Sequence, residues 1–281
     1  LFSSQTKNYV KKFIKLEKKN DSTIIEIHNR PSYIQILSKE IKRKILVLYF
    51  HNDPLSMDGS KTIQERKYLL KTCYKIIFNS SWSKKRFLEG LENKFVNSDK
   101  LLIFHQSANK GSIDLVNKKE KWITFVGKLN KAKGYDVFAS AIKKVLNRNA
   151  SWKAKIIGDE KREKIILEHD RAHILGFKKH SEVLQIFKKT SIAVACSRWE
   201  EPFGRTSLEA SANGCAVVIT NKGGLPETVT DAKILKRLSV KELTNTINYL
   251  IKNEKIRRKL QKLSIKNFYL THSFVAASID N

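Results

Sequence analysis

Short apolar runs alternate with amphipathic stretches along much of this chain. Trp122–Val126, Ile192–Ser197 and Cys215–Thr220 are of strand length, apolar and partly β-branched, which is typical of buried strands. In Tyr135–Leu146 the apolar positions recur at helical spacing instead. Strands that alternate with helices favour a parallel sheet covered on both faces. The pattern therefore predicts an α/β chain.

Further strands are predicted on both sides of these runs. Trp152–Asp159 and His173–Phe177 have strand character and contain glycine. Earlier in the chain, Ile24–Pro31 and Ile45–Pro54 are strand–loop units that each contain His-Asn, and Ile76–Trp82 is a strand that leads into a helix. Because ligands of such sheets bind at the carboxyl ends of the strands, the loops that follow the strands are the candidate sites.

The segment Glu-Pro-Phe-Gly-Arg-Thr-Ser-Leu-Glu at 201–209 carries the strongest chemical signal. Its Phe-Gly pair opens a predicted helix, whose first backbone N–H groups lack partners and attract an anion such as a phosphate. Glu201 precedes that helix and Glu209 lies two turns inside it, so each carboxylate can accept hydrogen bonds from hydroxyls. An anion flanked by two sets of hydroxyls describes a sugar nucleotide.

A second motif follows the strand Trp122–Val126. Gly127 and Gly134 bracket the turn into the next helix, where glycine permits close approach of the backbone to a ligand. Lys128 and Lys133, in the same turn, can place ammonium groups on a diphosphate, where charge grows as the leaving group departs.

Together with the Gly-Gly-Leu-Pro-Glu loop at 223–227, these motifs resemble the C-terminal half of retaining glycosyltransferases of family 4, whose shared domain is called glycosyl transferase group 1. The resemblance implies the GT-B architecture of two Rossmann-like domains. It implies that Glu201 faces the donor sugar, that Glu209 meets the ribose, and that the backbone near Phe203, Gly204, Arg205 and Thr206 meets the diphosphate. The family usually has arginine where this chain has Lys128, and an ammonium lacks the bidentate fork of a guanidinium.

The same resemblance assigns a role to His51. It follows a predicted strand at the position where family members commonly place a histidine near the transferred sugar. From the residue alone, a structural histidine is the more common interpretation, and this applies also to His28.

The resemblance also divides the chain. It predicts a partial acceptor-side Rossmann-like domain at 1–106, a linker at 107–121, a nucleotide-sugar-binding domain at 122–267 and a crossover helix at 268–281 that returns to the first domain. Because the chain starts at Leu1 and residues 1–25 lack the family's glycine-rich loop, the first domain is expected to be incomplete at its N-terminus.

Composition narrows the class of protein. The 281 residues are 41% hydrophobic, without low-complexity tracts, a secretory signal or an apolar run long enough to span a bilayer. Cys73, Cys196 and Cys215 form no metal-ligand spacing and are interpreted as reduced core residues of a cytoplasmic protein. No metal cofactor is expected, since lysines and amides supply the charge compensation and no Asp-x-Asp pair is present.

The net charge of +28 is spread over both halves of the chain and favours an anionic partner. Membrane phospholipid and a phosphorylated glycolipid fit this charge, and a lysine-rich composition without a specific partner is the alternative. Nucleic acid is not expected, because no zinc-finger, RNA-recognition or helix-turn-helix signature accompanies the charge. Lys7–Lys19 is either a surface helix packed on its own sheet or a basic amphipathic helix that rests on anionic lipid at the inner face of the cell membrane.

The leading hypothesis is a retaining glycosyltransferase that moves a sugar from a nucleotide diphosphate sugar to a hydroxyl of a cell-surface glycan or lipid-linked acceptor. The alternative is a protein that binds a nucleotide sugar without turnover. Glycoside hydrolysis is disfavoured, since it needs two carboxyl groups that flank one bond, whereas here a helix start places an anion between them.

Overall fold

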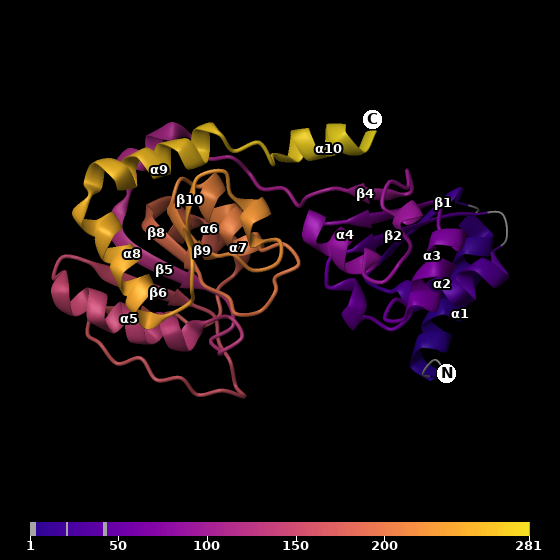
Figure 1. The fold of residues 1–281 in the computed structure, drawn as a ribbon, viewed down its shortest axis with the longest axis horizontal. Coiled ribbons are helices and arrows are strands. Elements are labelled where there is room, and N and C mark those ends of the chain that lie inside the picture. The colour runs from indigo at the N-terminus through magenta and orange to yellow at the C-terminus, as the bar shows by residue number, and fades with distance from the viewer. Residues whose placement is uncertain (1–3, 21, 42–43, 281) are drawn as a thin grey trace. The chain divides into compact units, whose positions relative to one another are not determined.

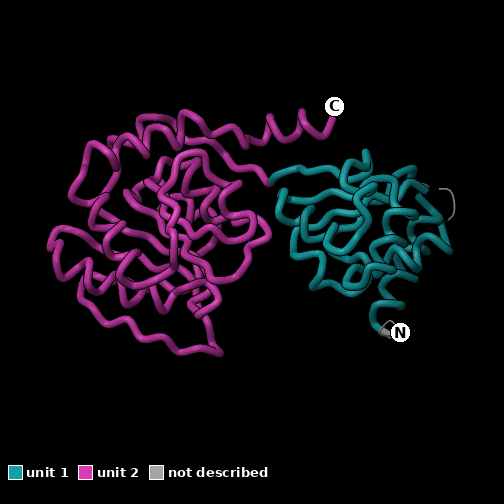
Figure 2. Tube along the Cα trace, viewed as in Figure 1, with its two compact units in different colours: residues 1–105 teal, residues 106–281 magenta. Residues whose placement is uncertain are grey.

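A computed structural model describes residues 4–20, 22–41 and 44–280 of the chain. It divides the chain into two compact units, residues 1–105 and residues 106–281 (Figure 2). Leu1 and Asn281, the outer ends of the predicted first and last segments, lie outside the described residues. Both units are built from parallel strands joined by helices (Figure 1). The predicted α/β class is confirmed.

Unit 1 holds a four-stranded parallel sheet of order β1-β2-β3-β4. Its strands are β1 (Ile24–His28), β2 (Ile45–Phe50), β3 (Lys75–Phe78) and β4 (Leu101–Ile103). Its helices are α1 (Ser4–Asn20), α2 (Pro31–Glu40), α3 (Ile63–Thr72) and α4 (Ser81–Leu88). The sequence predicted the strand at 76–78 but none at 101–103, where β4 pairs with β3 as a further strand of this unit.

One face of the unit 1 sheet carries the core. Side chains of alternate register, among them Ile25, Ile27 and Leu48, are buried against all of the helices in this unit. Along β1 the opposite register is exposed and contains Glu26 and His28. The titratable side chains of β1, Glu26 and His28, are therefore on the exposed face of the sheet.

The basic helix α1 uses its apolar side inside unit 1. Val10 and Ile14 are buried in the core cluster, and Phe13 packs against it. This burial supports the interpretation of α1 as a surface helix packed on its own domain. Among the helices in the described part of the chain, none is both long enough and apolar enough to cross a membrane.

Unit 2 holds a six-stranded parallel sheet of order β10-β9-β8-β5-β6-β7. Its strands are β5 (Glu120–Val126), β6 (Lys153–Ile157), β7 (Ala172–Ile174), β8 (Thr190–Ala195), β9 (Ala216–Thr220) and β10 (Ala232–Leu235). Its helices are α5 (Tyr135–Arg148), α6 (His180–Lys189), α7 (Arg205–Ala212), α8 (Val240–Lys252), α9 (Glu254–Lys266) and α10 (His272–Asp280). Ala108 and Val116, within the segment predicted as a linker, are buried in this unit.

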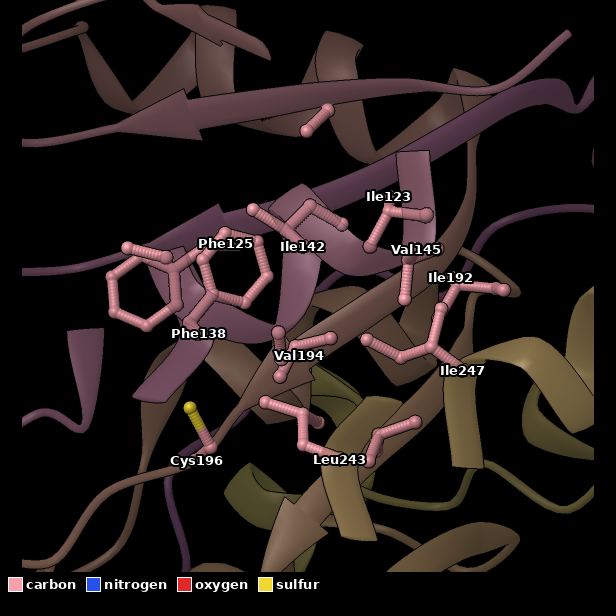
Figure 3. Close-up of a cluster of buried hydrophobic side chains, with 14 of the residues drawn as sticks. Ile123, Phe125, Phe138, Ile142, Val145, Ile192, Val194, Cys196, Leu243 and Ile247 are labelled. Carbon is pink, nitrogen blue, oxygen red and sulfur yellow. The ribbon is translucent and has the colours of Figure 1, made fainter. Parts of the chain in front are cut away.

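Both faces of the unit 2 sheet are covered, which explains why its inner strands β8 and β9 are buried almost along their whole length. On one face, Ile123 and Phe125 of β5 and Ile192 and Val194 of β8 pack against α5 and α8 (Figure 3). On the other face, the strands pack against Val183 and Phe187 of α6 and Ala210 of α7. The three cysteines are free and buried, as predicted. The sheet of unit 2 is therefore packed against helices on both faces.

Candidate functional site

The strand order of unit 2 creates one special position in its sheet. From β5 the chain proceeds outward through β6 and β7, whereas β8, which lies on the other side of β5, leads outward through β9 and β10. The two loops that leave β5 and β8 therefore diverge from adjacent strands. Such a switch point, at the carboxyl ends of the strands, is where open α/β sheets bind ligands. The motif at 127–134 lies in the loop after β5, and the motif at 201–209 lies after β8, so both are at this switch point.

Glycine lets these two loops touch. Gly134 has φ 72°, and a Cβ atom there would lie 1.9 Å from the carbonyl oxygen of Cys196. Next to this contact, the two guanidinium nitrogens of Arg198 donate to the two carboxylate oxygens of Asp136, each at 2.7 Å. Arg198 thereby lowers the pKa of Asp136, so this clamp stays charged at neutral pH.

The Gly-Gly-Leu-Pro-Glu loop at 223–227 packs against the backbone of Glu201. Gly223 has φ 59°, and a Cβ atom there would lie 2.1 Å from the carbonyl oxygen of Glu201. Gly224 donates its N–H to that same oxygen at 2.6 Å. Glycine at 223 is therefore required for the close packing that sets the position of Glu201.

The three motifs enclose a cavity of about 250 Å³ at the switch point. Its lining residues come from the loops after β5 and β8, from the start of α7 and from the glycine loop: Phe125, Val126, Gly127, Lys133, Ala195, Ser197, Glu201, Gly204, Arg205, Thr206 and Leu225. Six of the predicted site residues are in this set: Gly127, Lys133, Glu201, Gly204, Arg205 and Thr206. They are far apart in the sequence, and the fold brings them to one place.

The cavity combines a cation, a carboxylate and a helix start. Lys133 Nζ lies 2.5 Å from Glu201 Oε1. Helix α7 begins at Arg205, after Gly204 with φ 114°. The first backbone N–H groups of α7 have no carbonyl partner within the helix, and they carry the positive end of its dipole. An anion in this cavity meets both the ammonium group of Lys133 and these amides.

Glu209 is close to this arrangement but does not line the cavity. Its side chain is 7% exposed, and its Oε1 accepts from Arg205 Nη2 at 2.8 Å and from His180 Nε2 at 2.9 Å. Since Arg205 does line the cavity, it connects Glu209 to the helix start. His180, the first residue of α6, was not among the residues that the sequence singled out.

The remaining predicted residues of unit 2 are placed differently. Lys128 is not among the cavity-lining residues. The side chain of Phe203 is 2% exposed and packs against Leu208 and Phe268 in a small apolar cluster, so only its backbone is available to a ligand. The ring of Phe203 anchors the loop on which Glu201 and Gly204 lie.

His51 belongs to unit 1, at the carboxyl end of β2. Its Nε2 lies 2.9 Å from Nδ1 of His28, with the two rings nearly coplanar. Asn29, in a left-handed conformation with φ 55°, accepts the main-chain N–H of His51 at 2.7 Å. Burial and the neighbouring His28 lower the pKa of His51. The two His-Asn units of the sequence are therefore one hydrogen-bonded pair, which no local pattern revealed.

A wider cavity of about 680 Å³ lies in unit 1, between α1 and the edge strand β1. Glu26, His28 and Arg30 line it together with aromatic side chains of α1 and α2. None of the residues predicted as site residues is part of its lining. The smaller cavity of unit 2 is therefore the candidate site, because predicted chemistry and geometry coincide there. Among the described residues, no group of three or more His, Cys, Asp or Glu side chains is arranged to hold a metal ion.

Comparison with known proteins agrees with this location. A family model described as "Glycosyl transferases group 1" matches residues 109–267, which include all of these unit 2 loops. "Spore coat protein SA" of Bacillus subtilis is 21% identical over 277 residues, covering 88% of this chain and 74% of that protein. An uncharacterized glycosyltransferase of Methanocaldococcus jannaschii, MJ1178, is 30% identical over 204 residues, 69% of this chain, and the chain spans only 54% of it.

Solved structures show the same fold. The crystal structure of Anabaena Alr3699/HepE in complex with UDP and glucose matches with a TM-score of 0.78 at 18% identity, over 100% of this chain and 82% of that one. These similar structures show that the two units correspond to the two Rossmann-like domains of the GT-B fold.

Proposed function

Because this chain belongs to the glycosyl transferases group 1 family, and is by family a glycosyltransferase, we propose that it is a retaining enzyme of family 4. In this proposal it moves a sugar from a nucleotide diphosphate sugar to a hydroxyl of a cell-surface glycan or lipid-linked acceptor. Retention means that the bond from the anomeric carbon to the diphosphate breaks, and that the bond from this carbon to the acceptor oxygen forms on the same face of the sugar.

One observation carries the proposal: Lys133, Glu201 and the first turn of α7 line a single cavity at the switch point of the sheet. A diphosphate in that cavity gains the ammonium group and the helix amides, which stabilise the negative charge that develops as it leaves. Glu201 orients the sugar through its hydroxyls, and Glu209 accepts from the ribose. We assign His51 a contact with the transferred sugar as well.

The relatives support the chemical class of the substrates. Anabaena Alr3699/HepE has been crystallised with UDP and with UDP-glucose, which supports a nucleotide sugar as donor for this chain. The name of the Bacillus relative refers to the spore coat, which supports an acceptor among cell-surface polymers. We further propose that transfer needs no metal ion, since Lys133 and the α7 amides provide positive charge at the site. A cytoplasmic location is also part of the proposal.

Two other interpretations are less well supported. Binding of a nucleotide sugar without turnover does not need a cation and a carboxylate side by side, and the pairing of Lys133 with Glu201 in one cavity supports turnover instead. Peripheral contact with anionic lipid stays a proposal that rests on the charge of +28, because the apolar side of α1 is buried within unit 1.

Isothermal titration of the full chain with UDP-, GDP- and ADP-sugars tests the proposal. We expect one of these donors to bind, and Glu209→Ala to weaken that binding. Transfer is then followed with the donor that binds, and the anomeric configuration of the product is read by NMR. If no donor binds, or if Glu209→Ala binds as tightly as wild type, the proposal fails.

A further inference from the structure

The carboxylate of Glu209 is held from two sides. Arg205, one helical turn before it on α7, donates to Glu209 Oε1 from Nη2 at 2.8 Å and from Nε at 3.2 Å. His180, at the start of α6, places Nε2 at 2.9 Å from the same oxygen. Because a carboxylate oxygen only accepts hydrogen bonds, His180 carries its proton on Nε2 in this contact.

All three bonds end on Oε1. Among the described residues, no hydrogen bond reaches Oε2 of Glu209, although the side chain is only 7% exposed. A buried carboxylate needs hydrogen-bond partners to remain charged at this low exposure. His180 and Arg205 meet that need through one oxygen, and the other oxygen remains able to accept from a ligand.

The two donors differ in what else they can do. Arg205 lines the cavity, so its guanidinium is also drawn to a diphosphate bound there. His180 lies outside that lining, and its side chain is 60% exposed. His180 is thus the one of these two donors to Glu209 Oε1 that a diphosphate in the cavity does not compete for.

We propose that His180 is a positioning residue that orients Glu209, so that Glu209 Oε2 accepts from the ribose hydroxyls of the donor nucleotide. This rests on the proposed function, and it adds a residue that determines selectivity for ribose over deoxyribose. The role is indirect, because His180 acts through Glu209 and does not itself contact the sugar.

Two substitutions separate positioning from a general effect on structure. His180→Leu removes the donor, whereas His180→Gln keeps an N–H at about the position of Nε2. His169→Leu is the control, since His169 is a partly buried histidine of the same unit whose ring bonds to Asn147 and to the Arg171 N–H instead. Circular dichroism checks that each variant folds, and the exposure of His180 favours this.

The measurement is isothermal titration of the full chain with UDP, GDP and ADP, and then with the 2′-deoxy and 3′-deoxy forms of whichever binds. Wild type, His180→Gln and His169→Leu are expected to prefer the ribonucleotide by roughly tenfold or more, as for a hydrogen bond to a charged group. In His180→Leu this preference is expected to fall to about twofold or less.

The outcomes are distinct. If Glu209→Gln loses the preference while His180→Leu retains it, the positioning role is overturned and the proposed function stands. If His180→Leu weakens the ribonucleotide and its deoxy forms equally, the positioning role is also overturned. If none of the three nucleotides binds the wild type, the proposed function fails, and the assignment of His180 fails with it.

Discussion

Lys133 Nζ and Glu201 Oε1 are 2.5 Å apart, although 68 residues separate them in the chain. The pair joins the loop after β5 to the loop after β8 across the switch point of the sheet. The cation that we assign to the diphosphate is paired with the carboxylate that we assign to the sugar. In the proposed function, donor binding exchanges this ionic partner of Lys133 for the diphosphate.

Replacing Lys133 tests this exchange. Lys133→Met is expected to weaken binding of the nucleoside diphosphate roughly tenfold to a hundredfold, since a hydrogen bond to a charged group contributes about 1.5–3 kcal/mol. Isothermal titration measures the change. Lys131→Met, in the same loop but outside the cavity lining, is the matched control and should bind like wild type.

Glu201→Gln provides the complementary result. It removes the competing charge without removing the cation, so affinity for a nucleoside diphosphate that lacks the sugar should be kept or increased. Transfer of the sugar should fall, by about a hundredfold if loss of orientation is the main effect. Equal loss of affinity in Lys133→Met and Lys131→Met would remove the basis for this account of the pair.

Gly134 gives a prediction on stability. Gly134→Ala places a Cβ 1.9 Å from the Cys196 carbonyl oxygen at φ 72°, so both the clash and the left-handed backbone oppose it. Gly176→Ala is a matched control, with φ 64° and no heavy atom within 4 Å of the added Cβ. We expect about 1–2 kcal/mol of destabilisation for Gly176→Ala from the backbone alone, and a clearly larger loss for Gly134→Ala.

Urea unfolding followed by tryptophan fluorescence compares the two glycine variants. Trp122, Trp152 and Trp199 all report on unit 2. A Gly134→Ala protein as stable as Gly176→Ala would mean that the loops after β5 and β8 are not in the close contact described here.

The pH dependence of unit 1 follows from His51. Its pKa is lowered from the ordinary 6.5, first by burial and second by His28. Between the lowered pKa and 6.5, the unfolded chain binds more protons at this residue than the folded chain. The contribution of His51 to the free energy of unfolding is therefore complete above pH 6.5, and it is lost as the pH falls through that window.

NMR titration of the ring protons of His51 in the full chain measures this pKa directly. His28→Gln, which removes the neighbouring charge, should raise the pKa of His51 only part of the way back, because burial is the larger cause. A titration midpoint of His51 at or above pH 6.5 in the wild type would contradict the burial of His51 beside His28.

Metal removal tests the proposed charge compensation. Because Lys133 and the amides of α7 are assigned to the diphosphate, EDTA treatment is expected to leave the transfer rate unchanged. The rate is measured with and without added Mg²⁺ or Mn²⁺ after dialysis. Loss of transfer on dialysis and recovery with either ion would assign part of the role of Lys133 to a metal.

Much of this fold could be predicted because its inner strands carry continuous buried runs. All five residues of β9 are buried, and β8 is nearly as enclosed, so their composition alone indicates buried strands. By contrast, β4 has three residues and β10 has four, one of them the half-exposed Ile234. β4 and β10 carry too little local pattern to be identified, and the pairing with a neighbouring strand defines them.

The candidate site was predictable only in its separate parts. The glycines at 127, 134 and 204 indicated loops that bind an anion, because a backbone with positive φ favours glycine at a specific position of the sequence. The pairing of His180 with Glu209 depends on the packing of α6 against α7, and that of His28 with His51 depends on the order of the strands in the sheet. This packing and this order are properties of the whole fold, so neither pair could be inferred from spacing.

The central claim is that a nucleoside diphosphate binds at the switch point of unit 2, with its phosphates at the start of α7. A crystal structure of the full chain with the nucleoside diphosphate that binds tests this most directly. We predict phosphate oxygens within hydrogen-bond distance of Lys133 Nζ and of the backbone N–H groups of Gly204–Thr206, with a ribose hydroxyl on Glu209. A nucleotide bound elsewhere, or one whose phosphates point away from the start of α7, would contradict the account.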